Sequence, residues 1–277
     1  MSTSDSKNRP LNHAPPRPGV LRRMTRLITD HRTVRRLDPD PLRQDLVSGS
    51  HTVSYLRHLV RGNEIKYKRW TEPLADHHPP VLLIHGFLGT RGSMYVIEQR
   101  LIQDGFNVIS FNLGMLNVRD IRSSALLIHR KVLSVLEQTK QPRIDIIGHS
   151  MGGLIGLYYI KRLGGQKHVR RLIQLGTPNH GTWVALLGVA TLGLLSSSSW
   201  QLLPGSPFLA DLHRGALPQE VEFYTIAAER DWVCPPTATQ LEGAHAITVP
   251  LGHSSLVMSE EVYRKVLWAL RKDDTPR

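Results

Sequence analysis

The chain has 277 residues, 40% of them hydrophobic, with 22 glycines, 18 prolines and a formal net charge of +12 at pH 7. This length allows one large domain or two ordinary ones, and the composition excludes disordered, fibrous and coiled-coil proteins. No stretch reaches the roughly 18 consecutive apolar residues that a membrane-spanning helix needs. The one cysteine, Cys234, excludes an intramolecular disulfide.

The amino-terminal residues 1–18 are polar and rich in proline, which predicts a disordered tail. They contain no apolar core of the kind that a secretory signal requires, so export by the general pathway is not expected. Together with the lone cysteine, this favours a cytoplasmic protein that is at most peripheral at the membrane.

Residues 19–75 are expected to form a basic extension that is partly helical. Residues 1–80 hold 15 Lys and Arg against 8 Asp and Glu. From Val20 to Val34, apolar residues recur at alternating spacings of four and three among arginines, which predicts a short basic amphipathic helix. Docking on the main domain and contact with an anionic membrane surface stay open as its role. Nucleic acid is disfavoured because no recognition motif accompanies the charge.

Residues 76–277 are expected to form the main domain, because short apolar runs alternate there with longer helical patterns. Such alternation is typical of an α/β fold with a mostly parallel sheet and helices on both of its faces. Strands are predicted at 81–85, 107–111, 143–148, 169–176, 221–228 and 245–249. Helices are predicted at 93–104, 118–139, 151–163 and 259–272.

The alternation fails at residues 182–218, where an apolar run and four consecutive serines suggest a helical cap or lid over an apolar cleft. A packed helical excursion with no such role is the alternative. Residues assigned to the lid or to the substrate pocket are His149, Trp183, Leu186, Leu187, Trp200 and Phe208.

Ser150 lies in the stretch Gly-His-Ser-Met-Gly, which follows a predicted strand and precedes an apolar helix. A serine in this context occupies a tight, strained turn, where side chains at the flanking positions would clash. Gly148 and Gly152 relieve that crowding. The turn predicts that the hydroxyl of Ser150 is exposed at the edge of the sheet as a nucleophile.

From about residue 79 to 272 the chain resembles the lipases and esterases of the α/β-hydrolase fold, in particular the bacterial triacylglycerol lipase-like branch. The second motif that carries this resemblance is His-Gly-Phe-Leu-Gly-Thr at residues 85–90. The resemblance implies that the backbone amides of Phe87 and Met151 form an oxyanion hole, and that His85 is structural. Phe87 departs from the triple-glycine loop of other esterases and resembles the version that handles longer acyl chains.

A serine nucleophile needs a histidine base that a carboxylate holds in place. The family order is serine, acid, histidine, and His253 lies between the last predicted strand and the last helix, where this fold places its base. Asp231 follows the strand at 221–228 and is the expected acid, with Glu229 as the rival. Asp145, inside the strand before Ser150, is expected to anchor a neighbouring loop. The histidines considered and not favoured as the base are His168, His180, His213 and His245.

A metal site at Asp76, His77 and His78 is disfavoured, because adjacent residues on a strand point to opposite sides and no third ligand is evident. The glycines of residues 86–92 lack the lysine of a phosphate-binding loop. No cofactor is therefore expected.

The sequence predicts a serine carboxylic-ester hydrolase, foremost a lipase acting on acylglycerol or another hydrophobic ester through an acyl-enzyme. An esterase or thioesterase for soluble short-chain substrates is one alternative. The other is a non-catalytic, membrane-associated protein that has kept the fold.

Overall fold

The computed structural model describes residues 41–61, 78–110, 113, 117–192 and 196–272. The predicted tail at 1–18 and the predicted helix from Val20 to Val34 lie outside these residues.

Six strands form one parallel sheet in the order β2-β1-β3-β4-β5-β6. All six predicted strands are confirmed, each within a few residues of its expected position. Their bounds are Val81–Ile84 (β1), Val108–Ser110 (β2), Ile144–His149 (β3), Val169–Leu175 (β4), Glu222–Ala228 (β5) and His245–Val249 (β6). The central strands are almost continuously apolar because a parallel sheet is covered on both faces.

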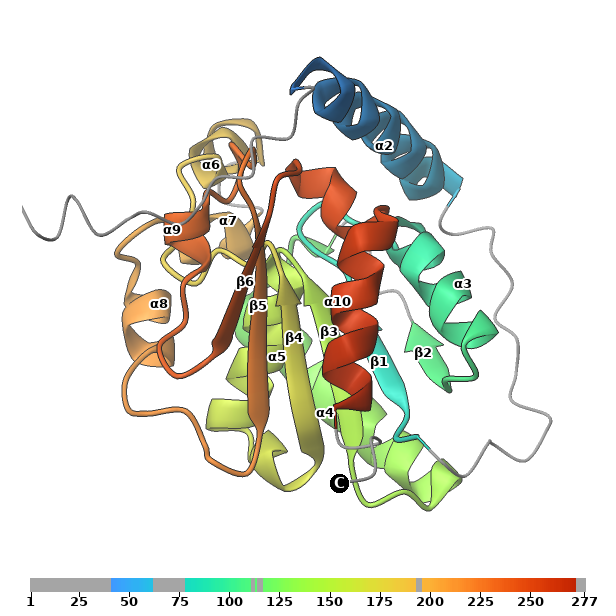
Figure 1. Ribbon diagram of the computed structural model, residues 1–277. Helices are drawn as coiled ribbons and strands as arrows, with labels where there is room; N and C mark the ends of the chain where they lie inside the picture. Colours follow the sequence, from blue (N-terminus) through green and yellow to red (C-terminus); the bar gives the residue numbers. More distant parts are fainter. Residues whose placement is uncertain (1–40, 62–77, 111–112, 114–116, 193–195, 273–277) are drawn as a thin grey trace, which may run out of the picture. The chain divides into compact units, whose positions relative to one another are not determined.

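Helices cover both faces of the sheet, as predicted (Figure 1). The helices α4 (Ile121–Thr139) and α5 (Met151–Arg162) pack on one face, while α3 (Tyr95–Gln103) and α10 (Glu260–Arg271) pack on the other. Side chains that alternate along β1 divide between the two cores: Leu82 faces the α4–α5 side and Leu83 faces the α3–α10 side. The predicted α/β architecture is therefore confirmed.

Short helical segments join these elements. They are η1 (Arg91–Met94), η3 (Gly165–Lys167), α9 (Pro236–Thr239) and η5 (His253–Val257). A longer helix, α2 (Pro41–Arg61), precedes the first strand and falls within the extension that was expected to be partly helical.

The insertion between β4 and β5 forms three short helices, α6 (Ala185–Leu192), α7 (Ser197–Gln201) and α8 (Pro207–Leu212). The side-chain amide of Gln201 donates to Asp120 Oδ2 over 2.7 Å and accepts from the backbone amide of Ile121 over 2.8 Å, which fixes α7 to the start of α4. Phe208 is 3% exposed and packs in the core beside Tyr158. The end of the insertion is therefore packed, whereas Leu186 on α6 and Trp200 on α7 are exposed.

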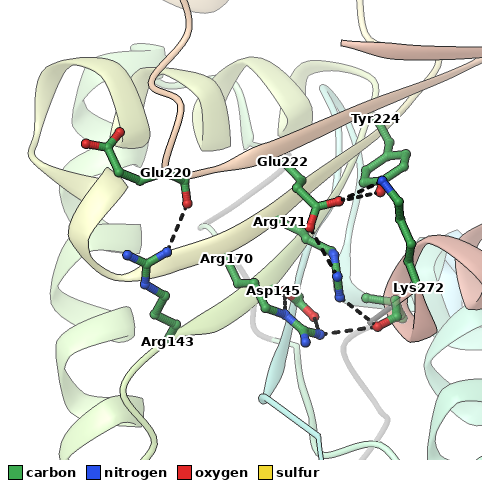
Figure 2. Close-up of polar contacts among 9 residues, drawn as sticks. Arg143, Asp145, Arg170, Arg171, Glu220, Glu222, Tyr224 and Lys272 are labelled. Carbon is green, nitrogen blue, oxygen red and sulfur yellow. Dashed lines mark hydrogen bonds and ion pairs between the residues drawn. The ribbon is translucent and has the colours of Figure 1, made fainter. Parts of the chain in front are cut away.

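A network of charged side chains joins β3, β4, β5 and α10 near the amino ends of the strands (Figure 2). The guanidinium of Arg170 donates to both carboxylate oxygens of Asp145, over 3.0 and 2.6 Å. Arg171, which is fully buried, pairs with Glu222 at 3.2 Å and donates to the carbonyl of Leu270 over 2.8 Å. Asp145 thus pairs with a residue of the neighbouring strand β4. The expectation that it anchors a neighbouring loop is wrong.

Candidate functional site

Ser150 occupies the turn between β3 and α5 with φ 52° and ψ −127°. A positive φ is strained for a residue with a side chain and costs about 1–3 kcal/mol. The flanking glycines permit the turn: a Cβ on Gly148 would lie 2.5 Å from the backbone nitrogen of Gly153, and one on Gly152 would lie 2.2 Å from the carbonyl oxygen of Ile84. The tight turn predicted from the sequence is the one observed.

The backbone of this turn is held from β4 and from the loop that follows it. The amide of Ser150 donates to the carbonyl of Leu175 over 2.8 Å, and the hydroxyl of Thr177 donates to the carbonyl of Ser150 over 3.0 Å. A Cβ on Gly153 would lie 2.0 Å from the Thr177 hydroxyl, so the loop and the helix are in direct contact. Sequence reasoning missed Thr177, which lies three residues before His180 in the segment that follows β4.

Asp231 and His253 come together at the carboxyl ends of β5 and β6. His253 Nδ1 donates to Asp231 Oδ2 over 2.6 Å. The other oxygen, Asp231 Oδ1, accepts from the backbone amides of Val233 and Cys234 over 2.9 and 2.7 Å. The carboxylate side chain is fully buried and the imidazole is 19% exposed. With Nδ1 donating to the carboxylate, the imidazole is oriented and its Nε2 is left for another partner.

The rival residues lie elsewhere. Glu229 is exposed, and its amide donates to the carbonyl of Val249. His180 and His213 stack on each other at 5.7 Å between ring centroids, and His245 stacks on Tyr224 at 5.0 Å. Cys234 is buried, and burial, and secondly the charge of Asp231, raise the pKa of its thiol well above the usual range.

The loop at residues 85–90 turns back on itself at the carboxyl end of β1, with Leu88 at φ 53°. The side-chain amide of Asn117 donates to the carbonyls of His85 and Gly86 over 3.2 and 3.3 Å. These bonds fix the direction of the peptide groups that precede Phe87. Sequence reasoning did not identify Asn117, since no pattern distinguishes it.

Phe87 and Met151, the two candidate oxyanion donors, differ in their surroundings. Met151 is the first residue of α5, and the amides of a helix's first turn have no partner within the helix. Phe87 is partly buried and packs against the core on the α4–α5 side.

His85 is buried and serves the loop as a neutral ring. Its Nδ1 donates to the carbonyl of Gly86 over 3.2 Å, and its Nε2 accepts from the amide of Leu113 over 3.3 Å. Burial lowers the pKa of His85 to about 4, against the opposing effect of the Gly86 carbonyl. The structural role expected for His85 agrees with these contacts.

His149 lies between a ring of α2 and the ring of His253. Its ring centroid is 6.0 Å from that of Tyr55 and 4.8 Å from that of His253. Burial, and secondly the nearby His253, lower the pKa of His149 well below its usual value. The nearby backbone of His253 opposes this shift. Neither ring nitrogen has a partner with hydrogen-bonding geometry among the described residues.

Within the described residues no group of three or more His, Cys, Asp or Glu side chains could hold a metal ion. Asp76 and His77 lie outside those residues, and His78 stacks on Phe106. Among the helices that the structure describes, none combines the length and the apolar character needed to cross a membrane.

Comparison with known proteins identifies the fold. Residues 79–200 match a family model described as alpha/beta hydrolase fold. The mature form of Bacillus licheniformis lipase BlEst2 superposes with a TM-score of 0.61 at 15% identity, over 72% of this chain and 96% of that one; its propeptide form is covered to 52%. Aspergillus fumigatus lipase B gives 0.58 at 15% identity, over 74% and 55% of the two chains. A monoacylglycerol lipase from Paleococcus ferrophilus gives 0.54 at 14% identity, over 70% and 96%. The described chain therefore has the α/β-hydrolase fold.

Proposed function

On this α/β-hydrolase fold, we propose that the protein is a serine hydrolase of carboxylic esters. The observation that carries the proposal is the 2.6 Å hydrogen bond from His253 to the buried Asp231, formed at the same edge of the sheet as the strained turn of Ser150. Solved structures with the same fold that are named as lipases and as an esterase support the same reaction class.

In this mechanism His253 Nε2 takes the proton of Ser150 as its oxygen attacks the ester carbonyl carbon. Asp231 keeps the imidazole in the required tautomer and stabilises its positive form. The amides of Phe87 and Met151 donate to the oxyanion. The proton then passes to the departing alcohol, and water releases the acid from the acyl-enzyme by the same steps.

For the substrate, we propose an ester with an apolar acyl group, such as an acylglycerol. The support is apolar surface beside the residues assigned to catalysis: Leu88, next to Phe87, is exposed, and Trp232, next to Asp231, is 76% exposed. Trp183 is 70% exposed and follows Thr182, whose hydroxyl donates to the carbonyl of Val233. The candidate lid is then the exposed α6 with Trp183, Leu186 and Leu187, because α7 and α8 are anchored by Gln201 and Phe208.

We also propose that the basic residues 1–40 bring the enzyme to anionic lipid surfaces, on the strength of their charge. Deleting residues 1–40 is expected to reduce sedimentation with phosphatidylserine vesicles at low salt. Unchanged sedimentation would contradict this part of the proposal and leave the hydrolase assignment intact.

The test of function is hydrolysis of p-nitrophenyl esters of increasing acyl length, with and without an emulsified interface, by the parent and by Ser150→Ala. We expect the parent to prefer long chains, to gain from the interface, and to lose its activity in the variant. Activity restricted to short dissolved esters would make the protein an esterase. The absence of any Ser150-dependent hydrolysis would contradict the proposal.

Trp183→Ser tests the assignment of the apolar surface. Its expected effect is a higher KM for long-chain esters with little change for short ones, because Trp183 would contact only the distal part of the acyl chain. An equal effect on both ester lengths would count against that contact.

A further inference from the structure

Helix α2 lies outside the segment that matches the family model, yet it contacts two loops of the candidate site. The hydroxyl of Thr52 forms a 2.8 Å hydrogen bond with that of Ser254, and His51 Nδ1 forms one of 3.1 Å with the hydroxyl of Ser255. Ser254 and Ser255 are the two residues directly after His253. The segment after β6 that carries the candidate base, the His253 loop, includes η5 and is therefore bonded to α2 at two successive positions.

The same helix is bonded to the loop that carries Phe87. The hydroxyl of Thr90 donates to the carbonyl of Leu59 over 2.9 Å, and the ring of His58 stacks on Tyr95 at 5.2 Å. Thr90 follows β1 and Ser254 follows β6, and three strands separate β1 from β6 in the sheet. Helix α2 thus links loops that the sheet itself does not bring into contact.

Between these two attachments, Tyr55 begins a chain of aromatic rings that ends at His253. Tyr55 is partly buried, and its ring lies 6.0 Å from His149, which lies 4.8 Å from His253. Burial raises the pKa of Tyr55, and a hydrogen bond with Ser93 opposes that shift. His149 is buried, so its ring is packed against its surroundings, which include these two rings.

The spacing of these residues shows that α2 has a dedicated inner face. His51, Tyr55 and His58 are four and three residues apart and so share one side of the helix. Val53, Leu56 and Val60 are three and four residues apart and so share the opposite side of the helix, where their side chains are exposed. The side of the helix toward the site is thus polar and aromatic, which suits specific contacts better than general burial.

We propose that α2 is a positioning element of this site. It holds the His253 loop and the Phe87 loop in fixed positions relative to each other. Tyr55 sets the plane of the His253 ring through His149. This inference rests on the proposed function, since it assigns α2 a role in the same reaction. None of the α2 side chains is required to touch the substrate.

The test compares Tyr55→Ala with Leu56→Ala, its neighbour on the outer face, in the full-length protein. A displaced base costs turnover and not binding, so Tyr55→Ala is expected to lower kcat for a short soluble ester about tenfold with KM nearly unchanged. Leu56→Ala should retain the parent kcat. Tyr55→Phe keeps the ring and should restore most of the kcat, and the Tm of each variant separates this effect from a general loss of stability.

A spectroscopic readout distinguishes failure of this inference from failure of the proposed function. The NMR resonance of the His253 Nδ1 proton, assigned by its loss in His253→Gln, reports the hydrogen bond to Asp231 without any substrate. Tyr55→Ala is expected to move or broaden this resonance while Leu56→Ala leaves it unchanged. If the parent hydrolyses no ester, the function fails and this resonance alone decides the positioning role.

Should Tyr55→Ala fail to fold, Thr52→Val decides, with Val53→Thr as its matched control on the outer face. Losing the bond to Ser254 is expected to lower kcat about threefold. The inference is overturned if Tyr55→Ala and Thr52→Val have the same kcat and the same His253 resonance as their outer-face controls Leu56→Ala and Val53→Thr.

Discussion

Two buried aspartates at opposite ends of the sheet form contacts of the same length and differ in their partners. Asp145, near the amino end of β3, and Asp231, after the carboxyl end of β5, each have a fully buried side chain and a 2.6 Å contact to a basic group. The partner of Asp145 is the guanidinium of Arg170, which stays charged at any pH of interest. The partner of Asp231 is an imidazole, whose second ring nitrogen can accept a proton.

Burial and distance alone therefore do not distinguish a structural carboxylate from a candidate catalytic one. Burial raises the pKa of Asp145, and Arg170 opposes that rise. The carbonyl of Leu270 also binds Arg170, so this pair is satisfied within the fold. Asp231 and His253 are bonded to each other in a way that leaves the second imidazole nitrogen for a further partner.

Replacing each aspartate by asparagine tests directly whether the two carboxylates have different roles. Asp231→Asn keeps an oxygen for the amides of Val233 and Cys234 but no longer holds the reactive tautomer of His253, so kcat for a short ester should fall about 10⁴-fold with the fold retained. Asp145→Asn leaves Arg170 without its charge partner and should cost about 3–5 kcal/mol of unfolding free energy, with kcat of the folded fraction preserved. Steady-state kinetics and urea unfolding measure the two effects, and similar losses of kcat in both variants would contradict the distinction.

The crowding of the Ser150 turn gives the next prediction. Gly152→Ala places a methyl group 2.2 Å from the carbonyl oxygen of Ile84 and should cost about 1–3 kcal/mol of unfolding free energy, together with a loss of turnover. Gly49→Ala on α2 is the control: it meets no atom within 4 Å and should stabilise the protein by up to about 1 kcal/mol. Denaturant unfolding of both variants measures this. Equal stability of the two would mean that the turn relaxes.

Acid should destabilise the fold through the buried His85, which lies at the carboxyl end of β1. The pKa of His85 is lowered in the folded state to about 4 from 6.5, so its contribution to stability is complete above pH 6.5 and is lost as the pH falls toward 4. Between pH 7.5 and 5 this group should account for about 2 kcal/mol of lost unfolding free energy. In His85→Gln, urea unfolding at the two pH values should show a loss smaller by that amount. If His85→Gln lost as much unfolding free energy between the two pH values as the parent, a group other than His85 would cause the loss.

Asn117→Ala is expected to have the smallest effect, because it releases the carbonyls of His85 and Gly86 and only indirectly moves the amide of Phe87. We expect kcat to fall about tenfold with little change in KM. Ser124→Ala removes the 3.4 Å contact to the other side of the Asn117 amide and keeps the two loop bonds, so it serves as the control. If Asn117→Ala had the same kcat as the control, Asn117 would not be needed to position the amide of Phe87.

The sheet could be predicted because its signals are local, and the site candidates were chosen from signals of the same kind. Each strand is a short apolar run, and Ser150, Asp231 and His253 are recognisable from their position just after strands. The partner of Asp145 was predicted wrongly, since which of two neighbouring elements supplies a counter-ion depends on strand register. Asn117 and Thr177 were missed because a single polar residue that binds a backbone carbonyl has no periodic pattern.

Helix α2 and the insertion show a different limit. On α2 the apolar Val53, Leu56 and Val60 are exposed and the aromatic Tyr55 faces the site, so the usual rule that apolar residues face the core would orient the helix wrongly. In the insertion, Phe208 and Trp183 are both large aromatic residues, but Phe208 is packed in the core and Trp183 is exposed. Hydrophobicity alone does not separate the exposed part of the insertion from its packed part.

Covalent trapping tests directly whether Ser150 is the nucleophile that His253 and Asp231 activate. Treating the parent with diethyl p-nitrophenyl phosphate should release one equivalent of p-nitrophenol, and peptide mass spectrometry should find the diethylphosphoryl group on Ser150. Asp231→Asn should react far more slowly, while Asp145→Asn should react at the parent rate. Modification of another residue, or equal rates in the two aspartate variants, would contradict the account.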